Sequence, residues 1–258
     1  MWFITMAANC YSYSSNKPYT CLGKRTRALI TMLFSCLLSI NYVAQAADVE
    51  NLQIGIIGSG KVGSALGKAW LNTGHQVMFS SQHLEDDQQL ASTLGSRAHA
   101  GTPREAAAYG SVLLIAVPYA ALPTLGVELG ELINDKIIID ASNPIVSRDG
   151  EMAIAAREQG VGLASITFLP KARIVRAFNA IPAAKMAEAA SKHEQYAMPI
   201  AGDEPQAIRI VSELIRQVGY EPVLVGSLAK MGKYLIPGTP LAGEKSVDEL
   251  HKIASELK

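Results

Sequence analysis

A glycine-rich segment suited to nucleotide chemistry lies near the start of the regularly patterned part of the chain. Gly58, Gly60 and Gly63 form a G-x-G-x-x-G motif between an apolar run, 53–57, and a helical pattern, 61–72. At such a strand-to-helix junction the first glycine permits a tight turn, the second lets the backbone approach a pyrophosphate, and the third lets helix and strand pack closely. The motif therefore predicts a dinucleotide site in which the free N–H groups of the helix start hold the anion.

The other residues of this loop belong to the same predicted site. Ser59, Lys61 and Val62 complete the loop and the first turn of the helix. A glycine turn without a ligand is the competing interpretation, and the strand before the motif and the helix after it favour the cofactor site.

The end of the second predicted strand indicates which dinucleotide is bound. It reads Ser80-Ser81-Gln82-His83, and the first carboxylate follows at Glu85. An acidic side chain here would accept a hydrogen bond from the ribose 2′-hydroxyl and repel a 2′-phosphate. Its absence predicts NADP, with NAD as the alternative. If these residues only begin a surface loop, they leave the cofactor undetermined.

Two more strand ends are expected at the same crevice, because ligands of open α/β sheets bind outside the carboxyl ends of the strands. Val117 and Pro118 follow one strand, and Ser142 and Asn143 follow another. We expect these four residues to contact the cofactor. Asp140, at the end of the latter strand, is expected to cap a helix or a turn rather than to bind the ligand.

From residue 52 onward, short β-branched runs alternate with helical stretches, a pattern typical of a parallel sheet covered by helices on both faces. The predicted fold is α/β, a Rossmann-type doubly wound parallel sheet with a small C-terminal α/β extension. Strands are expected at 53–57, 76–80, 112–117, 137–140, 174–178, 197–201 and 222–225, and helices at 61–72, 86–94, 103–109, 151–159 and 204–218. An alanine-rich helix candidate lies in the linkage between 178 and 199.

The first 46 residues have the order of a secretory signal peptide. Four basic residues, Lys17, Lys24, Arg25 and Arg27, precede an apolar run at 28–43. A stretch of small residues that ends at Ala46 follows this run. We expect export to the periplasm or the medium by a Sec-type signal, without stable membrane insertion after cleavage. A retained anchor and a misassigned start codon, which would leave the protein cytoplasmic, are the alternatives. All three cysteines, Cys10, Cys21 and Cys36, lie in this segment, so a cleaved chain has no thiol chemistry.

Composition narrows the remaining functional classes. Hydrophobic residues make up 49% of the chain, which is enough for a sizeable core. Lys plus Arg and Asp plus Glu both number 23, so no basic surface for nucleic acid is indicated. The histidines lack metal-ligand spacing, and no metal site is expected. The predicted organisation is a signal peptide at 1–46, an NAD(P)-binding Rossmann domain at 47–180, and an extension at 181–258 that completes the substrate site.

Taken together, five segments resemble the NADP oxidoreductases that use the deazaflavin coenzyme F420. They are the glycine loop, Ser80-Ser81-Gln82, Ala116-Val117-Pro118, Asp140-Ala141-Ser142-Asn143-Pro144 and Val175-Arg176-Ala177-Phe178-Asn179. The resemblance extends over residues 52–230, and the same domain resembles the cytosolic portion of six-transmembrane ferric reductases.

This resemblance implies hydride transfer between nicotinamide and a deazaflavin, flavin or ferric acceptor, with no obligatory acid or base and hence no assigned catalytic residue. It further implies Ser59, Ser81 and Gln82 near the 2′-phosphate and Ser142 and Asn143 near the nicotinamide, with Val117 and Pro118 at the nicotinamide ribose. The family usually has arginine where Gln82 stands, so only a modest preference for NADPH is expected. The expected partner is a small-molecule redox substrate, and a homodimer is one option. A non-catalytic NAD(P)-binding redox sensor or binding subunit is the alternative function.

Overall fold

The computed structural model describes residues 49–189 and 196–257. The predicted signal peptide and the three cysteines lie outside the described residues. None of the helices in the described ranges is both long and apolar enough to cross a membrane.

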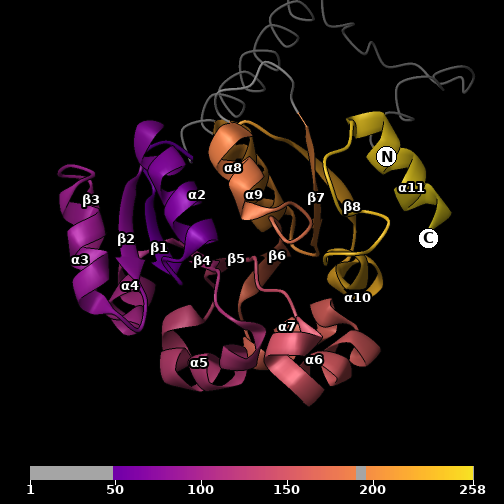
Figure 1. Cartoon of the computed structure of the whole chain (residues 1–258), viewed down its shortest axis with the longest axis horizontal. Coiled ribbons are helices and arrows are strands. Elements are labelled where there is room, and N and C mark those ends of the chain that lie inside the picture. Colours follow the sequence, from indigo (N-terminus) through magenta and orange to yellow (C-terminus); the bar gives the residue numbers. More distant parts are fainter. Residues whose placement is uncertain (1–48, 190–195, 258) are drawn as a thin grey trace, which may run out of the picture. The chain divides into compact units, whose positions relative to one another are not determined.

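Eight strands form one sheet in the order β3-β2-β1-β4-β5-β6-β7-β8 (Figure 1). All neighbouring strands pair in parallel except β6 and β7, which are antiparallel. The strands are β1 (Gln53–Ile57), β2 (Gln76–Ser80), β3 (Ala98–Ala100), β4 (Val112–Ile115), β5 (Ile137–Asp140), β6 (Arg173–Arg176), β7 (Ala197–Gly202) and β8 (Glu221–Gly226). The Rossmann-type α/β class predicted from the sequence is confirmed.

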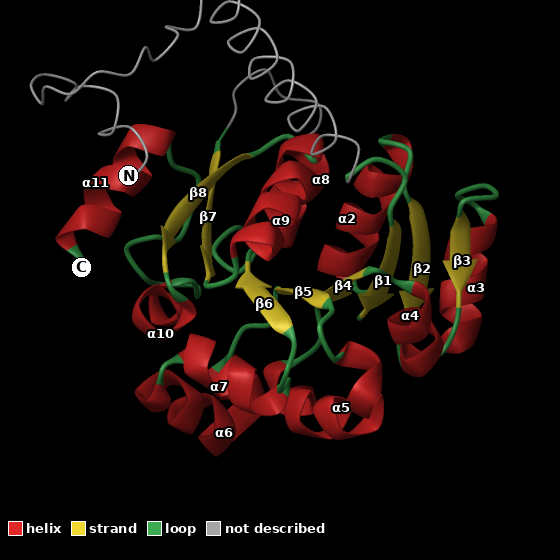
Figure 2. Cartoon of the chain, turned by 180° about the vertical axis from the view of Figure 1, so that it is seen from behind, coloured by secondary structure: helices red, strands yellow, loops and turns green. Residues whose placement is uncertain are grey.

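Helices cover both faces of the sheet, and each face has its own hydrophobic cluster (Figure 2). One cluster includes residues of α2, α8 and α9, and the other includes residues of α4, α5, α6, α7, α10 and α11. Alternation along a strand serves both faces: Ile56 lies in the first cluster and Ile57 in the second. The helices are α2 (Lys61–Asn72), α3 (Leu84–Ser92), α4 (Pro103–Tyr109), α5 (Leu122–Leu129), α6 (Val146–Gln159), α7 (Val161–Phe168), α8 (Ala183–Ala189), α9 (Pro205–Gln217), α10 (Leu228–Met231) and α11 (Val247–Glu256).

The departures from the sequence expectations have local causes. Strand β3 is only three residues long, which is too short to show an alternating pattern. The helices α5 and α7 are apolar on most sides, so their sequences show no helical periodicity either. The expected strands 112–117 and 174–178 end two residues early in the structure, at Ile115 and Arg176. The antiparallel β6–β7 pair corrects the expectation of an all-parallel sheet, since a return strand reads like any other buried strand.

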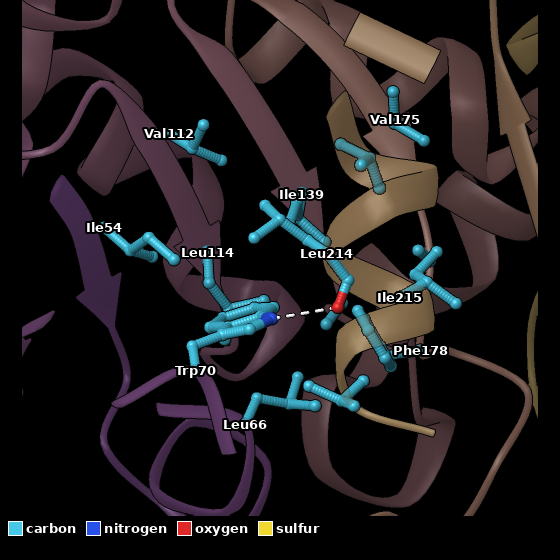
Figure 3. Packing of buried hydrophobic residues seen from close by; sticks show 14 of the residues in the cluster. Ile54, Leu66, Trp70, Val112, Leu114, Ile139, Val175, Phe178, Leu214 and Ile215 are labelled. Carbon is cyan, nitrogen blue, oxygen red and sulfur yellow. Dashed lines mark hydrogen bonds between the residues drawn. The ribbon is translucent and has the colours of Figure 1, made fainter. Parts of the chain in front are cut away.

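Trp70 of α2 packs against α9, which lies far along the chain (Figure 3). It is fully buried, and its indole Nε1–H donates to the Leu214 carbonyl oxygen of α9 at 3.0 Å. Its ring meets Phe178 edge-on, with 6.3 Å between the ring centroids. Edge-to-face packing and a satisfied indole N–H are both stabilising for a buried tryptophan. The segment after residue 180 therefore shares its core with the first half of the chain.

His75 makes a second connection to α9. Its Nδ1 accepts from the Leu52 backbone N–H at 3.0 Å, and its Nε2 lies 2.6 Å from Gln217 Oε1. An accepting Nδ1 requires the neutral tautomer with hydrogen on Nε2. Burial lowers the pKa of His75 below its ordinary value, while the hydrogen bond to Gln217 opposes this shift.

We predict that acidification destabilises the protein through His75. The unfolded chain takes up a proton near pH 6.5, whereas the folded chain resists it. Stability from neutral His75 is therefore complete above about pH 6.5 and is lost as the pH falls toward the lower folded-state pKa. Free energies of unfolding from urea titrations should fall by at most about 1.4 kcal/mol per pH unit in this window.

In His75→Gln this slope should flatten, and stability at pH 8 should drop by about 1–3 kcal/mol because the Leu52 N–H loses its acceptor. His251→Gln, at an exposed histidine, is the matched control and should keep the wild-type slope. Equal slopes in His75→Gln and wild type would contradict the assignment.

Candidate nucleotide-binding site

The candidate site lies at the point of the sheet where the order of the strands reverses. Strand β1 lies between β2 and β4, so the chain leaves β1 toward one side and later returns on the other. In open α/β sheets this switch point leaves a crevice outside the carboxyl ends of the strands. The glycine loop follows β1, Ser81 follows β2, and Val117 follows β4. Three of the predicted segments therefore meet at one edge of the sheet.

Each glycine of the motif has a different steric surrounding. Gly58 has φ of +102°, and a Cβ there would lie 2.5 Å from the Ala116 carbonyl oxygen. A Cβ at Gly63 would overlap the Gly58 carbonyl oxygen. At Gly60, in contrast, a Cβ would meet no atom within 4 Å. The first and third glycines are thus needed for the fold, whereas the second faces open space, as a pyrophosphate cradle requires.

The N-terminus of α2 is free of internal capping. Its N-cap residue, Gly60, makes no side-chain hydrogen bond, and its first turn contains no acidic residue. Some other helices satisfy this end with side chains, as the capping boxes of Thr102 and Glu105 on α4 and of Ser246 and Glu249 on α11 do, whereas α3, α5, α6 and α7 also lack a side-chain cap. Uncapped N–H groups at the positive end of the helix dipole form an anion site.

A cavity of about 510 Å³ opens beside this helix end, a size suited to a nucleotide portion. It is lined by loop and helix residues, which are Ile57, Gly58, Ser59, Gly60, Ser81, Gln82, His83, Pro103, Ala116, Val117, Pro118, Ala121, Thr124, Leu125 and Glu128. Eight predicted cofactor-binding residues line it: Gly58, Ser59, Gly60, Ser81, Gln82, His83, Val117 and Pro118.

Six predicted site residues do not line this cavity. Lys61, Val62 and Gly63 form the first turn of α2 behind it. Ser80 is fully buried, and its Oγ donates to the Ile56 carbonyl oxygen at 2.8 Å. Ser142 Oγ donates to Asp140 Oδ1, and Asn143 Nδ2 donates to the Asn179 carbonyl oxygen. The placement of Ser142 and Asn143 beside a nicotinamide stays a prediction.

Behind two serines that line the cavity lies a buried carboxylate, which was not predicted as part of the site. Asp87, in the first turn of α3, is 1% exposed. Ser59 Oγ donates to its Oδ1, and Ser81 Oγ donates to its Oδ2 at 2.8 Å. Glu85, Asp86 and Asp87 read together as the acidic start of a helix, so nothing in the sequence separates the buried carboxylate from its exposed neighbours.

The sequence analysis also missed one wall of the cavity. Pro103 of α4 and Thr124, Leu125 and Glu128 of α5 line it opposite the glycine loop. The helix α5 gave no periodic signal, so its polar residues could not be assigned to a face. Within the described residues, no group of three or more His, Cys, Asp or Glu side chains could hold a metal ion.

A buried ion pair connects the last residues of β5 and β6. Arg176 Nη1 is 2.5 Å from Asp140 Oδ2, and both side chains are 0% exposed. Ser165 Oγ donates to the same carboxylate at 2.6 Å, and the Ser142 backbone N–H donates to Asp140 Oδ1 at 2.9 Å. The turn role expected for Asp140 is present, and the ion pair with Arg176 is an additional role. Burial raises the pKa of nearby Tyr119 to about 12, with the Asp140 charge adding to the effect.

The comparisons with known proteins agree with this geometry. A family model described as NADP oxidoreductase, coenzyme F420-dependent, matches residues 53–144, from β1 to the loop after β5. Metalloreductase STEAP3 from Rattus norvegicus is 30% identical over 183 residues, which cover 70% of this chain and 35% of that protein. The chain thus spans about a third of the length of this curated relative.

Two solved structures are similar to the chain. A hypothetical protein from Sinorhizobium meliloti matches with a TM-score of 0.64 and 25% identity, covering 76% of this chain and 95% of that one. A putative F420-dependent NADP-reductase from Arthrobacter sp. FB24 matches with a TM-score of 0.63 and 18% identity, covering 72% of this chain and 90% of that one. At this identity the second match supports the fold alone.

We predict that substitution of Gly60 impairs nucleotide binding, whereas substitution of Gly63 impairs folding. Gly60→Val should keep the thermal midpoint within about 2 °C, because the new side chain points into open space, and should weaken nucleotide binding at least tenfold by filling the cradle. Gly63→Val should lower the stability by several kcal/mol because its Cβ overlaps Gly58. Differential scanning fluorimetry and calorimetric titration with NADPH measure the two effects. Full nucleotide affinity in Gly60→Val would contradict the site.

We predict further that Gln82→Arg strengthens NADPH binding about tenfold. Gln82 is exposed at the cavity lining, and a guanidinium there adds charged donors for a 2′-phosphate. The affinity for NADH should change less than threefold, which makes NADH the internal control in the same titration. An equal gain for both nucleotides would indicate that this strand end does not face the adenosine ribose.

Proposed function

We propose that this chain, whose residues 53–144 match the family of NADP oxidoreductases dependent on coenzyme F420, transfers hydride between a nicotinamide nucleotide and a small-molecule acceptor. The acceptor class that we propose is a deazaflavin, a flavin or a ferric complex. NADP is the proposed nucleotide, with NAD as the alternative. The family is one of oxidoreductases, and the choice of acceptor is the finer part of the proposal.

The observation that carries the proposal is the uncapped N-terminus of α2 beside the open cradle at Gly60. The first N–H groups of this helix have no side-chain cap and are available to an anion, and the cavity next to them has a volume suited to the adenosine half of a dinucleotide. Val117 and Pro118 then direct the rest of the nucleotide along the carboxyl edge of the sheet toward Asn143.

When bound, a reduced nicotinamide supplies two electrons and a proton as hydride. The chain's own contribution is position and polarity. The glycine loop fixes the pyrophosphate, and the apolar side chains of Val117 and Leu125 exclude water from the cavity wall. The Asp140–Arg176 pair holds the Ser142 carbonyl oxygen through Arg176 Nη2 at 3.0 Å, which fixes the loop that leads to Asn143. No side chain is assigned as acid or base.

A second candidate function is a redox sensor that binds the nucleotide without turnover. We expect the acceptor ring beside Asn143, Phe178 and the segment 226–231. The sensor is favoured by the packing there, because Phe178, Leu228 and Met231 are 2%, 3% and 1% exposed. An enzyme needs room there for a second ring, whereas a sensor does not.

The experiment that tests the proposal follows both binding and turnover in residues 47–258. NADPH and NADH are titrated calorimetrically, and the oxidation of each is followed at 340 nm with coenzyme F420, FMN or ferric citrate as acceptor. Turnover with one acceptor, lost in Gly60→Val, is the expected result. Saturable binding with no turnover on any acceptor would favour the sensor, and absence of binding to both nucleotides would overturn the proposal.

A further inference from the structure

Asp87 accepts hydrogen bonds from Ser59 and Ser81, the two serines that the family resemblance implies near the ribose 2′ position. It connects two loops: Ser59 comes from the glycine loop after β1, and Ser81 comes from the end of β2. The same two loops are joined through the backbone, where the Gly58 N–H donates to the Ser80 carbonyl oxygen at 2.8 Å. Both serines line the cavity, whereas Asp87 is 1% exposed behind them.

The direction of these hydrogen bonds decides what the corner can offer a ligand. A hydroxyl has one hydrogen, and an ionised carboxylate only accepts. Ser59 therefore donates its only hydroxyl hydrogen to Asp87. Ser81 has Asp87 Oδ2 at 2.8 Å and the His83 carbonyl oxygen at 3.3 Å as acceptors, so its hydrogen also points into the protein. Ser81 Oγ already accepts from the His83 backbone N–H at 3.0 Å, so Ser59 and Ser81 have only their remaining oxygen lone pairs, and no hydroxyl hydrogen, to offer a ligand in the cavity.

Lone pairs suit one of the two nucleotides. A ribose 2′-hydroxyl can donate to them, whereas a 2′-phosphate has close to two negative charges at neutral pH and needs donors. The carboxylate adds like-charge repulsion at low local dielectric. In the described part of the chain, Asp87 forms no ion pair with a lysine or arginine, and its side chain bonds only to the two serines.

We infer that Asp87 is a specificity-determining residue, which reduces the preference for NADPH by holding Ser59 and Ser81 as acceptors toward the ribose 2′ position. This inference rests on the proposed function, because it requires that the nucleotide occupies this cavity. It gives the two serines a role opposite to that implied by the family resemblance, in which they donate to the phosphate. With glutamine at position 82, the corner then discriminates weakly, and the wild-type affinities for NADPH and NADH lie within about tenfold of each other.

The test is Asp87→Asn, a nearly isosteric change that removes the charge and frees at least one serine hydrogen. Calorimetric titrations use NADPH and NADH, and adenosine 2′,5′-bisphosphate and 5′-AMP isolate the corner from the nicotinamide end. The preference for the 2′-phosphorylated member of each pair should rise by about ten- to a hundredfold, with NADH and 5′-AMP changing less than threefold.

Asp86→Asn is the matched control. It removes the same charge from the same helix turn, but Asp86 is exposed. Its nucleotide preference should stay within twofold of wild type. Equal preferences in Asp87→Asn and Asp86→Asn would overturn the inference while leaving nucleotide binding intact. Absence of binding in the wild type would instead overturn the proposed function.

A second variant covers the case in which Asp87→Asn fails to fold. Ser59→Ala removes an acceptor for the 2′-hydroxyl, so NADH binding should weaken about three- to tenfold relative to NADPH. An unchanged preference, or a selective loss of NADPH, would show that the Ser59 hydroxyl does not act as an acceptor there and would overturn the inference. Thermal midpoints of the variants, measured beside wild type, report whether each one is folded.

Discussion

The carboxyl edge of the sheet depends on one buried ion pair, between Asp140 of β5 and Arg176 of β6. Arg176 also donates to the carbonyl oxygens of Ser142 and Leu235, which brings the loop after β5 and the segment after α10 to the same guanidinium. Removing either charge would leave the other buried without a partner, which typically costs about 3–5 kcal/mol. The far end of the proposed crevice therefore keeps its shape only while this pair is intact.

The near end of the crevice is organised by hydrogen-bond direction rather than by charge pairing. The helix α2 offers uncapped N–H donors, whereas the corner at Asp87 offers the hydroxyl oxygens of Ser59 and Ser81 as acceptors. The pyrophosphate of a dinucleotide accepts hydrogen bonds and therefore requires donors from the protein. An unmodified ribose hydroxyl can donate and is therefore bound by acceptors. The glycine spacing fixes the first requirement. The second depends on a single side chain of α3.

How far the sequence predicts this protein differs between its elements. The glycine motif, β1, α2, β2, α4 and β5 were predicted with their observed bounds, because apolar runs and capping signals are local. The helices α5 and α7 were missed because their sequences are apolar on most sides, and with α5 the wall at Thr124 and Glu128 was missed. Asp87 could not be distinguished from a helix-start acid, since its burial is set by two serines six and twenty-eight residues away. Properties that arise from tertiary contacts have no local signature.

The hydrogen bond between Trp70 and Leu214 has a consequence for how the chain is made. Its two residues are 144 positions apart, so at a synthesis rate of about 5–20 residues per second the tryptophan waits roughly 7–30 s for its acceptor. During that interval the inner face of α2 is uncovered, and His75 lacks Gln217 for the same reason. The core between α2 and α9 can therefore close only after most of the chain has been synthesised.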